Sequence, residues 1–288
     1  MKETLALVIL GLILAYLLAV TALKPAALVS PQGTASASKP ASNYLIQPRL
    51  NRDQSRSQAL EQIIRADIAS SSATFGILVK NLTTGQEVAI NPEEEFTTAS
   101  LYKLAVMYTL FYKAAHGQID ISDADTQNNL KAMIAYSSNE AAQALVERYT
   151  NWKEMTDLMY QLGLRSTKLN QDPPVTTPSD MGKFLELLAD GKAVDFDSST
   201  RMLELLTMQQ KKDRIPSLLP QSSTLIANKT GELDIVRHDV GIVGTPDNDY
   251  ILVLMSKGSG KGDSEITPIM AKLSQDIYDF FEQQRPNP

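Results

Sequence analysis

The chain has 288 residues, of which 43% are hydrophobic, and it carries a formal net charge of −6 at pH 7. This length and apolar content suffice for one large packed domain or two small ones, and the acidic balance argues against a nucleic-acid partner, because nucleic acids favour clustered lysine and arginine. Cysteine is absent and only His116 and His238 represent histidine. Disulfides, thiol catalysis and a multi-histidine metal site are therefore excluded, and although a carboxylate-rich metal site stays open, we expect no cofactor.

The N-terminal segment is predicted to anchor the protein to a membrane. Residues Thr4 to Leu23 form an uncharged, mostly apolar run of about 20 residues, the length needed to cross a bilayer. We therefore expect residues 1–24 to be an uncleaved transmembrane signal-anchor that holds the rest of the chain outside the cytoplasm. A cleaved signal peptide, which would release a secreted domain, is the alternative. Residues 25–56, rich in Pro, Ser, Ala, Gln and Asn, have the composition of a flexible linker.

Residues 57–288 are predicted to form the globular domain. Apolar residues at helical spacing predict a first helix from about residue 57 to 68, and a hairpin of two strands follows at Phe75–Asn81 and Glu87–Asn91. Helices are then expected near residues 100–115, 126–135, 139–149, 152–161, 178–189 and 198–209. The chain ends with three strands and a helix, at Thr224–Lys229, Val236–Gly244, Tyr250–Ser256 and Glu265–Glu282. This order predicts an α+β fold of three α/β/α-like layers, with one antiparallel sheet built from both ends of the domain and an all-helical block inserted between them.

The segment Ser100-Leu101-Tyr102-Lys103 is the first of three short motifs that could carry chemistry. On a helix, residues at i and i+3 have Cβ atoms about 5–6 Å apart, so the Lys103 amine could reach the Ser100 hydroxyl. A free lysine is a poor base at neutral pH, but burial and a second cation, for which Lys229 is the candidate, would lower its pKa. Taken alone, the motif also fits an ordinary exposed serine and lysine.

Two further motifs follow, Ser137-Ser138-Asn139 and Lys229-Thr230-Gly231. The first has a simple explanation, because Ser137 and Glu140 match a capping box at the start of a helix. The second fits a strand that ends in a turn at Gly231. The functional interpretation instead places a hydroxyl and an amide from the first motif opposite a cation and a hydroxyl on a sheet edge, where Lys229 and Thr230 would hold a substrate carboxylate.

Taken together and in this order, the three motifs resemble the S-x-x-K, S-D-N and K-T-G set of the class A β-lactamases and penicillin-binding proteins. Four surrounding segments resemble the same family: Phe96–Ser100, Thr176–Pro178, Arg214–Pro216 and Ala227–Gly231. The resemblance extends over about residues 57–284. It departs from the family pattern at Ser138, where the family carries an aspartate.

The resemblance implies a penicillin-recognising serine hydrolase that forms an acyl-enzyme on Ser100. The substrate would be a β-lactam or a D-Ala-D-Ala-like peptide such as a peptidoglycan stem peptide. Lys103 would take the proton of Ser100, and Ser137 would relay a proton to the leaving nitrogen. Asn139 would donate its amide to a carbonyl of the substrate.

The resemblance also assigns substrate-binding roles to residues at the end of the strand predicted at Thr224–Lys229. Lys229 and Thr230 would bind the substrate carboxylate, and Gly231 would let the substrate backbone approach closely. The backbone N–H groups of Ser100 and Glu232 would form the oxyanion hole. The resemblance gives the Glu232 side chain no role.

The loop before Thr176 lacks a residue that the class A enzymes use. Those enzymes carry a glutamate there that activates the deacylating water, whereas residues 169–175 contain no glutamate and offer Asp172 as their sole carboxylate. The groups for acylation are thus present, whereas the usual deacylating base is missing. A slow acyl-enzyme hydrolase, or a peptidoglycan D,D-peptidase-like enzyme, fits the residues at least as well as an efficient β-lactamase, and Asp172 is the candidate substitute base.

Two alternatives remain open. A Ser-His-Asp hydrolase would use His238 and Asp239, but neighbours on a strand point to opposite faces and no G-x-S-x-G motif occurs. The second is a non-catalytic, membrane-tethered module that holds cell-wall peptide in a degraded penicillin-binding cleft. The short loop favours it, whereas the retained lysines and serines argue against it.

Overall fold

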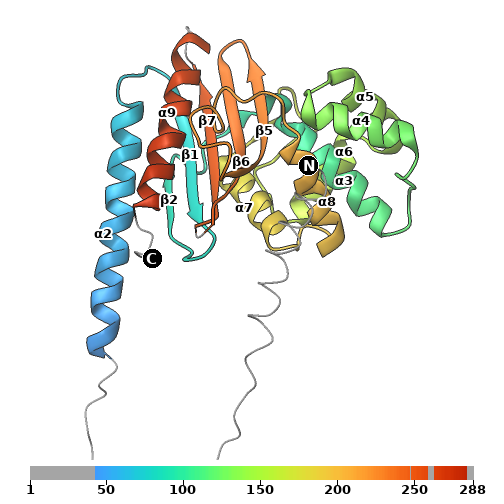
Figure 1. The fold of residues 1–288 in the computed structure, drawn as a ribbon. Helices are drawn as coiled ribbons and strands as arrows, with labels where there is room; N and C mark the ends of the chain where they lie inside the picture. The colour runs from blue at the N-terminus through green and yellow to red at the C-terminus, as the bar shows by residue number, and fades with distance from the viewer. Residues whose placement is uncertain (1–42, 247, 259–262, 284–288) are drawn as a thin grey trace, which may run out of the picture. The chain divides into compact units, whose positions relative to one another are not determined.

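A five-stranded antiparallel sheet forms the centre of the fold (Figure 1). The structure is a computed structural model, and it describes residues 43–246, 248–258 and 263–283. The strands lie in the order β2-β1-β7-β6-β5, with bounds Thr74–Asn81 for β1, Glu87–Ile90 for β2, Leu225–Leu233 for β5, Val236–Gly244 for β6 and Tyr250–Lys257 for β7. The pairing of β1 with β7 joins the two ends of the domain. This confirms the predicted sheet and leaves β5 at its edge.

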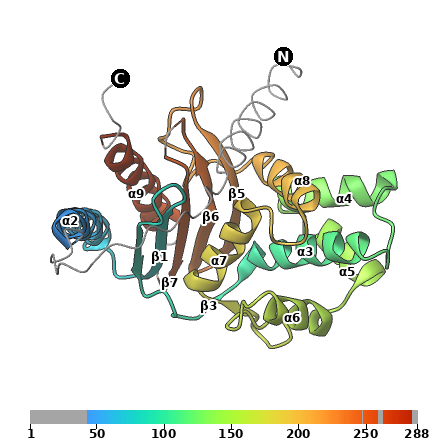
Figure 2. The ribbon, with the colours of Figure 1, turned by 90° about the horizontal axis from the view of Figure 1, so that it is seen from below.

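Helices cover both faces of the sheet, which gives the predicted three layers (Figure 2). The later part of α2 (Asn43–Ile68) and α9 (Asp263–Glu282) lie on one face, and α7 (Pro178–Ala189) lies on the other. Side chains on a strand alternate between the two faces. In β1, Ile77 and Val79 accordingly belong to the apolar cluster on the α2 and α9 face, whereas Leu78 belongs to the cluster on the helical-block face. Both faces are buried, so each holds its own core.

The inserted helical block contains the predicted helices. Their bounds are Tyr102–Ala115 for α3, Ala124–Ala135 for α4, Asn139–Tyr149 for α5, Trp152–Gln161 for α6 and Phe196–Thr207 for α8. The entrances of α4, α5, α6, α7 and α8 are each capped by a side-chain oxygen that accepts a backbone N–H, as capping preferences predict. Helix α3 is buried from Lys103 to Phe111, which makes it the central helix of the block.

Helix α2 begins at Asn43, earlier than the predicted domain boundary at residue 57. Residues 43–56, which composition assigned to a flexible linker, are therefore helical. After Pro48 the segment contains no further proline or glycine up to Ile68, so nothing in it interrupts a helix. The predicted anchor, residues 1–24, lies outside the described residues. In the ranges that the structure does describe, no helix is long and apolar enough to cross a bilayer.

Candidate active site

The Ser100 hydroxyl lies in a short turn between a strand and the central helix. Strand β3 (Phe96–Thr97) pairs with β4 (Val175–Thr176), a small sheet that the sequence did not predict, and the 3₁₀ turn Ala99–Leu101 leads directly into α3. The Thr98 N–H donates to the Pro174 carbonyl at 2.9 Å, which ties the turn to the loop before β4. Ala99 adopts a left-handed backbone with φ 45°, a conformation that costs free energy in a non-glycine residue and recurs at functional sites.

The Lys103 amine lies one helical turn after Ser100 and is fully buried. Its Nζ lies 3.2 Å from Ser100 Oγ and 2.8 Å from Asn139 Oδ1. It also donates to the Ser137 carbonyl oxygen and lies 3.3 Å from Ser137 Oγ. The S-x-x-K spacing therefore brings the Lys103 amine within reach of the Ser100 hydroxyl, as the sequence predicts. Residues at the start of α5 hold the amine in place.

The Ser137 hydroxyl points into the site, whereas its neighbour Ser138 caps helix α5. Ser138, and not Ser137 as the capping-box pattern predicted, is the N-cap of α5: its Oγ accepts the Ala141 N–H at 3.0 Å and donates to Glu140 at 2.9 Å. Ser137 has a left-handed backbone with φ 56°. This conformation points the two hydroxyls in different directions, so that the Ser138 hydroxyl caps α5 and the Ser137 hydroxyl faces the amines of Lys103 and Lys229.

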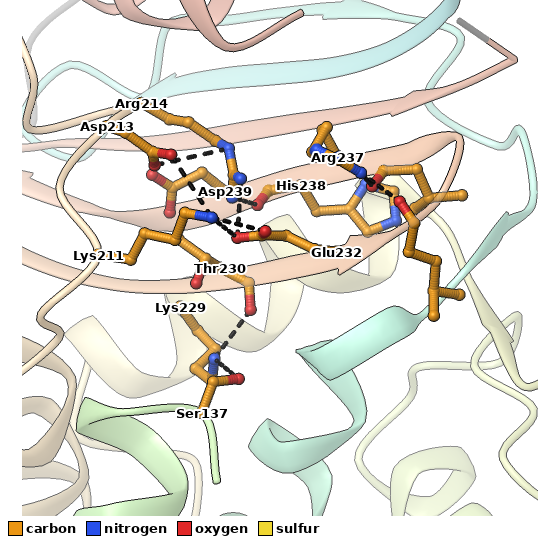
Figure 3. Close-up of polar contacts among 12 residues, drawn as sticks. Ser137, Lys211, Asp213, Arg214, Lys229, Thr230, Glu232, Arg237, His238 and Asp239 are labelled. Carbon is orange, nitrogen blue, oxygen red and sulfur yellow. Dashed lines mark hydrogen bonds and ion pairs between the residues drawn. The ribbon is translucent and has the colours of Figure 1, made fainter. Parts of the chain in front are cut away.

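Lys229 reaches the same place from the edge strand β5. Its Nζ donates to Ser137 Oγ at 2.9 Å and to the Thr230 carbonyl at 2.8 Å, and its side chain is fully buried (Figure 3). Ser100, Lys103, Ser137 and Lys229 thus form one continuous line of polar contacts. Three motifs that are far apart in the sequence converge at a single site.

Burial changes the acid–base properties of both amines. Desolvation lowers the pKa of Lys103 to about 8, although the negative charge of Glu140 opposes the shift. Desolvation also lowers the pKa of Lys229 to about 7, and the positive charge of Lys103 adds to the effect. Near neutral pH a measurable fraction of each amine is therefore unprotonated and can accept a proton from a hydroxyl.

The other predicted binding residues lie around this line. Asn139 Oδ1 accepts from Lys103, which leaves the amide nitrogen of this exposed side chain to donate. A Cβ placed on Gly231 would lie 3.2 Å from the Thr98 carbonyl oxygen and 3.3 Å from Leu101 Cγ, closer than such atoms normally pack. Gly231 therefore permits a close approach between β5 and the turn that carries Ser100.

A charged cluster that the motifs did not predict borders strand β5 (Figure 3). The Glu232 carboxylate pairs with Lys211 at 2.5 Å and with the fully buried Arg214 at 2.8 Å. Asp213 lies 3.6 Å from Lys211 and 3.8 Å from Arg214. Arg214 opens one of the segments that resemble the family, and this was the only sequence signal that pointed to the cluster.

The loop before β4 contains Asp172, the candidate substitute base. Asp172 is exposed, and no hydrogen bond links it to Ser100 or Lys103 in the described part of the chain. No group of three or more histidine, aspartate or glutamate residues within the described ranges is arranged to hold a metal ion.

The geometry of His238 contradicts the Ser-His-Asp alternative. The Nε2 atom of His238 lies 2.8 Å from the Thr97 carbonyl and its Nδ1 accepts the Ser256 N–H at 3.3 Å. Burial lowers the pKa of the imidazole to about 4. Asp239 points to other partners, Asn228 and the Ile215 N–H. With both nitrogens bound to backbone groups, His238 is a structural residue.

Comparison with known proteins places this arrangement in a family. The sequence matches the family described as "Beta-lactamase enzyme family" (Beta-lactamase2) over residues 58–128 and 124–281. The chain belongs to this beta-lactamase enzyme family. Among its relatives is the extended-spectrum β-lactamase PER-1 of Pseudomonas aeruginosa, which is 21% identical over 272 residues, covering 78% of this chain and 88% of the relative. Family membership makes the chain a β-lactamase-like serine hydrolase.

Solved structures of family members and penicillin-binding proteins share the fold. A β-lactamase from Sphaerobacter thermophilus superimposes with a TM-score of 0.71 at 20% identity, covering 79% of this chain and 98% of that chain. A variant of PBP-A, solved as an acyl-enzyme complex with penicillin G, superimposes with a TM-score of 0.72 at 20% identity, covering 80% of this chain and 97% of that one. The superfamily that the three motifs indicated is confirmed.

Proposed function

We propose that this protein is a penicillin-recognising serine hydrolase that forms an acyl-enzyme on Ser100 with a β-lactam or a D-Ala-D-Ala-like peptide. One observation carries the proposal: a buried amine of lowered pKa, Lys103 Nζ, lies 3.2 Å from the Ser100 hydroxyl oxygen. Ser100 itself is half-buried, so a substrate carbonyl can reach it. The mechanism follows from the contacts of these groups.

Acylation begins when Ser100 Oγ attacks the carbonyl carbon and its proton passes to unprotonated Lys103. The carbonyl oxygen becomes an oxyanion, for which we propose the backbone N–H groups of Ser100 and Glu232 as donors. The tetrahedral intermediate then collapses and the carbon–nitrogen bond breaks. Ser137 gives its proton to the leaving nitrogen and is reprotonated from Lys103, 3.3 Å away, with Lys229 holding its hydroxyl at 2.9 Å. The net result is an ester on Ser100 and a protonated leaving amine.

The substrate would lie along the free edge of β5. In this pose Lys229 and Thr230 face the substrate carboxylate, and the Asn139 amide donates to a carbonyl of its side chain. Hydrolysis of the ester needs an activated water. Because Asp172 is exposed and the neighbouring loop contains no other carboxylate, we propose that deacylation is slow.

Covalent labelling tests the proposal directly. The protein is incubated with a fluorescent penicillin and its intact mass is followed for hours, beside the Ser100→Ala variant and a Ser71→Ala control. We expect an adduct of one penicillin on the wild type and on the control, and none on Ser100→Ala. An adduct that persists for hours indicates the slow deacylation proposed above, and rapid clearance indicates an efficient β-lactamase. The absence of an adduct at any time would instead favour the non-catalytic peptide-binding module.

The rate of labelling should depend on pH through Lys103. We expect it to rise between about pH 6 and pH 9, because the amine can accept the Ser100 proton only after losing its own, and the midpoint should lie near the Lys103 pKa of about 8. A Lys229→Arg variant keeps a permanent positive charge beside Lys103, disfavours its protonated form and should move the midpoint to lower pH. A rate that falls steadily over this range would contradict the role of Lys103 as base.

We also propose that the domain works outside the cytoplasm, held by the apolar run from Thr4 to Leu23. The support is its uncharged composition and a length of about 20 residues, together with a substrate class found in the cell wall. Extraction of cell membranes at alkaline pH measures this: the full-length chain should stay with the membrane fraction, and release of the intact chain would contradict the anchor.

A further inference from the structure

The carboxylate of Glu232 is held by two cations at the end of the Lys229-Thr230-Gly231 motif. Lys211 Nζ donates to its Oε2 at 2.6 Å, and Arg214 Nη2 lies 2.8 Å from its Oε1 (Figure 3). Burial alone would raise the pKa of this carboxyl, but the hydrogen bonds from Lys211 and Arg214 outweigh it and hold the pKa below its ordinary value. Glu232 is therefore ionised at neutral pH while 31% of its side chain stays exposed.

The charge of the Glu232 carboxylate affects Lys229, which lies on β5, the strand that binds the substrate in the proposed function. Its negative charge favours the protonated form of Lys229, and the positive charge of Arg214 disfavours that form. Both charges therefore reach the amine that contacts Ser137. A ligand held by Lys229 and Thr230 would lie within the same electrostatic field.

Two cations of this region are already paired with the protein's own carboxylates. Lys211 and Arg214 pair with Glu232 and, at the longer distances of 3.6 and 3.8 Å, with Asp213. Lys229, with a pKa of about 7, is protonated in only part of the molecules at neutral pH. A substrate carboxylate would thus find Lys211 and Arg214 already paired and would approach the fixed negative charge of Glu232, which is unfavourable.

We propose that Glu232 limits the charge specificity of the site, because its carboxylate pairs with Lys211 and Arg214 beside Lys229 and Thr230, which hold the substrate carboxylate in the proposed function. The site then binds a substrate carboxylate more weakly than it would without the Glu232 charge, and it discriminates little against acyl donors that carry an uncharged group, such as an ester or a primary amide, at that position. This inference rests on the proposed function for the orientation of the substrate along β5. It assigns the Glu232 side chain a role in selecting substrates, separate from the backbone N–H that the proposed function uses.

Equilibrium binding tests the inference without requiring acylation. Calorimetry on the Ser100→Ala protein compares benzylpenicillin with its uncharged methyl ester, with and without the added change Glu232→Gln. Glutamine keeps the size of the side chain and one acceptor oxygen but removes its charge. We expect Glu232→Gln to raise the preference for the carboxylate over the ester by about tenfold, because Lys211 and Arg214 are left with a weaker partner. The same change should tighten the binding of benzylpenicillin itself.

The matched control is Asp213→Asn, which removes the same charge from the same cluster but leaves the Glu232 pairs in place. It should change the preference by less than about twofold, since its contacts to the two cations are longer. An unchanged preference in Glu232→Gln, an equal shift in Asp213→Asn, or no measurable binding of either ligand by any of the proteins would each overturn the inference. If Ser100 is never labelled but the preference shifts as expected, the specificity role stands and the catalytic proposal fails. Thermal melts confirm that each variant is folded.

Discussion

Replacing Lys103 with methionine is expected to slow the acylation of Ser100 by about 10²–10⁴-fold, the range that a positioned general base contributes. Lys103 is the basic group that contacts the Ser100 hydroxyl, and its Nζ also contacts Ser137 and Asn139. Its loss therefore removes the proton acceptor of the first step and the proton source for the leaving nitrogen. Methionine fills a similar volume and, as an uncharged side chain, removes the desolvation cost that lowers the Lys103 pKa. The fold should consequently survive the change.

The measurement is the second-order rate of labelling by a fluorescent penicillin at pH 8. Lys113→Met is the matched control, because Lys113 lies on the same helix α3 but pairs with Glu154 at 2.7 Å, away from Ser100. The control should label within about twofold of the wild type, as expected for a residue outside the reacting groups. A Lys103→Met protein that keeps more than a tenth of the wild-type rate would show that another group removes the proton.

Asp239→Ala is expected to lower the free energy of unfolding by about 3–5 kcal/mol, because each of two buried donors that loses its acceptor costs about 1–3 kcal/mol and Arg214 loses a nearby counter-charge. Asp239 is fully buried on β6 and accepts hydrogen bonds from Asn228 Nδ2 at 2.7 Å and from the Ile215 N–H at 3.0 Å. Burial raises the pKa of its carboxyl to about 6, although the hydrogen bond from Asn228 and the positive charge of Arg214 oppose this rise. The carboxyl is therefore mainly ionised at pH 7.5, and alanine would leave two buried donors without their acceptor and Arg214 with one counter-charge fewer.

Thermal and urea unfolding at pH 7.5 measure this loss. For a domain of this size it corresponds to a fall in melting temperature of about 6–20 °C. Asp190→Ala is the control, since Asp190 forms an exposed pair with Lys192 at 2.8 Å and such surface pairs contribute about 0–1 kcal/mol. A loss for Asp239→Ala no larger than that of the control would mean that Asn228, Ile215 and Arg214 are satisfied without the carboxylate.

The secondary structure was largely readable from the sequence because it depends on short-range patterns. Helical spacing of apolar residues located α3 to α8, and alternation with turn residues located the strands. The order of these elements was enough to predict the sheet built from both ends of the domain. The prediction was wrong where composition was the only guide: the polar segment from residue 43 to 56 was taken for a linker but continues α2.

The members of the candidate site were also present in the sequence, as three motifs whose order matches a known family. Their joint occurrence identified Ser100, Lys103, Ser137 and Lys229, and the family match bears out the superfamily. A motif gives the type and spacing of residues along the chain. It contains no information on which of two neighbouring hydroxyls caps a helix, and the capping box was for that reason assigned to Ser137 when Ser138 forms it.

Long-range contacts settled the rest, because they depend on how segments far apart in the chain pack together. The lowered pKa values of Lys103 and Lys229 arise from burial between α3, α5 and β5, and burial is a property of the packed domain. The pairing of Glu232 with Lys211 and Arg214 joins residues 21 and 18 positions apart across a loop, where no local pattern exists. Residue types and their order thus follow from the chain alone, whereas the charge state and the partner of each group follow from its three-dimensional neighbours.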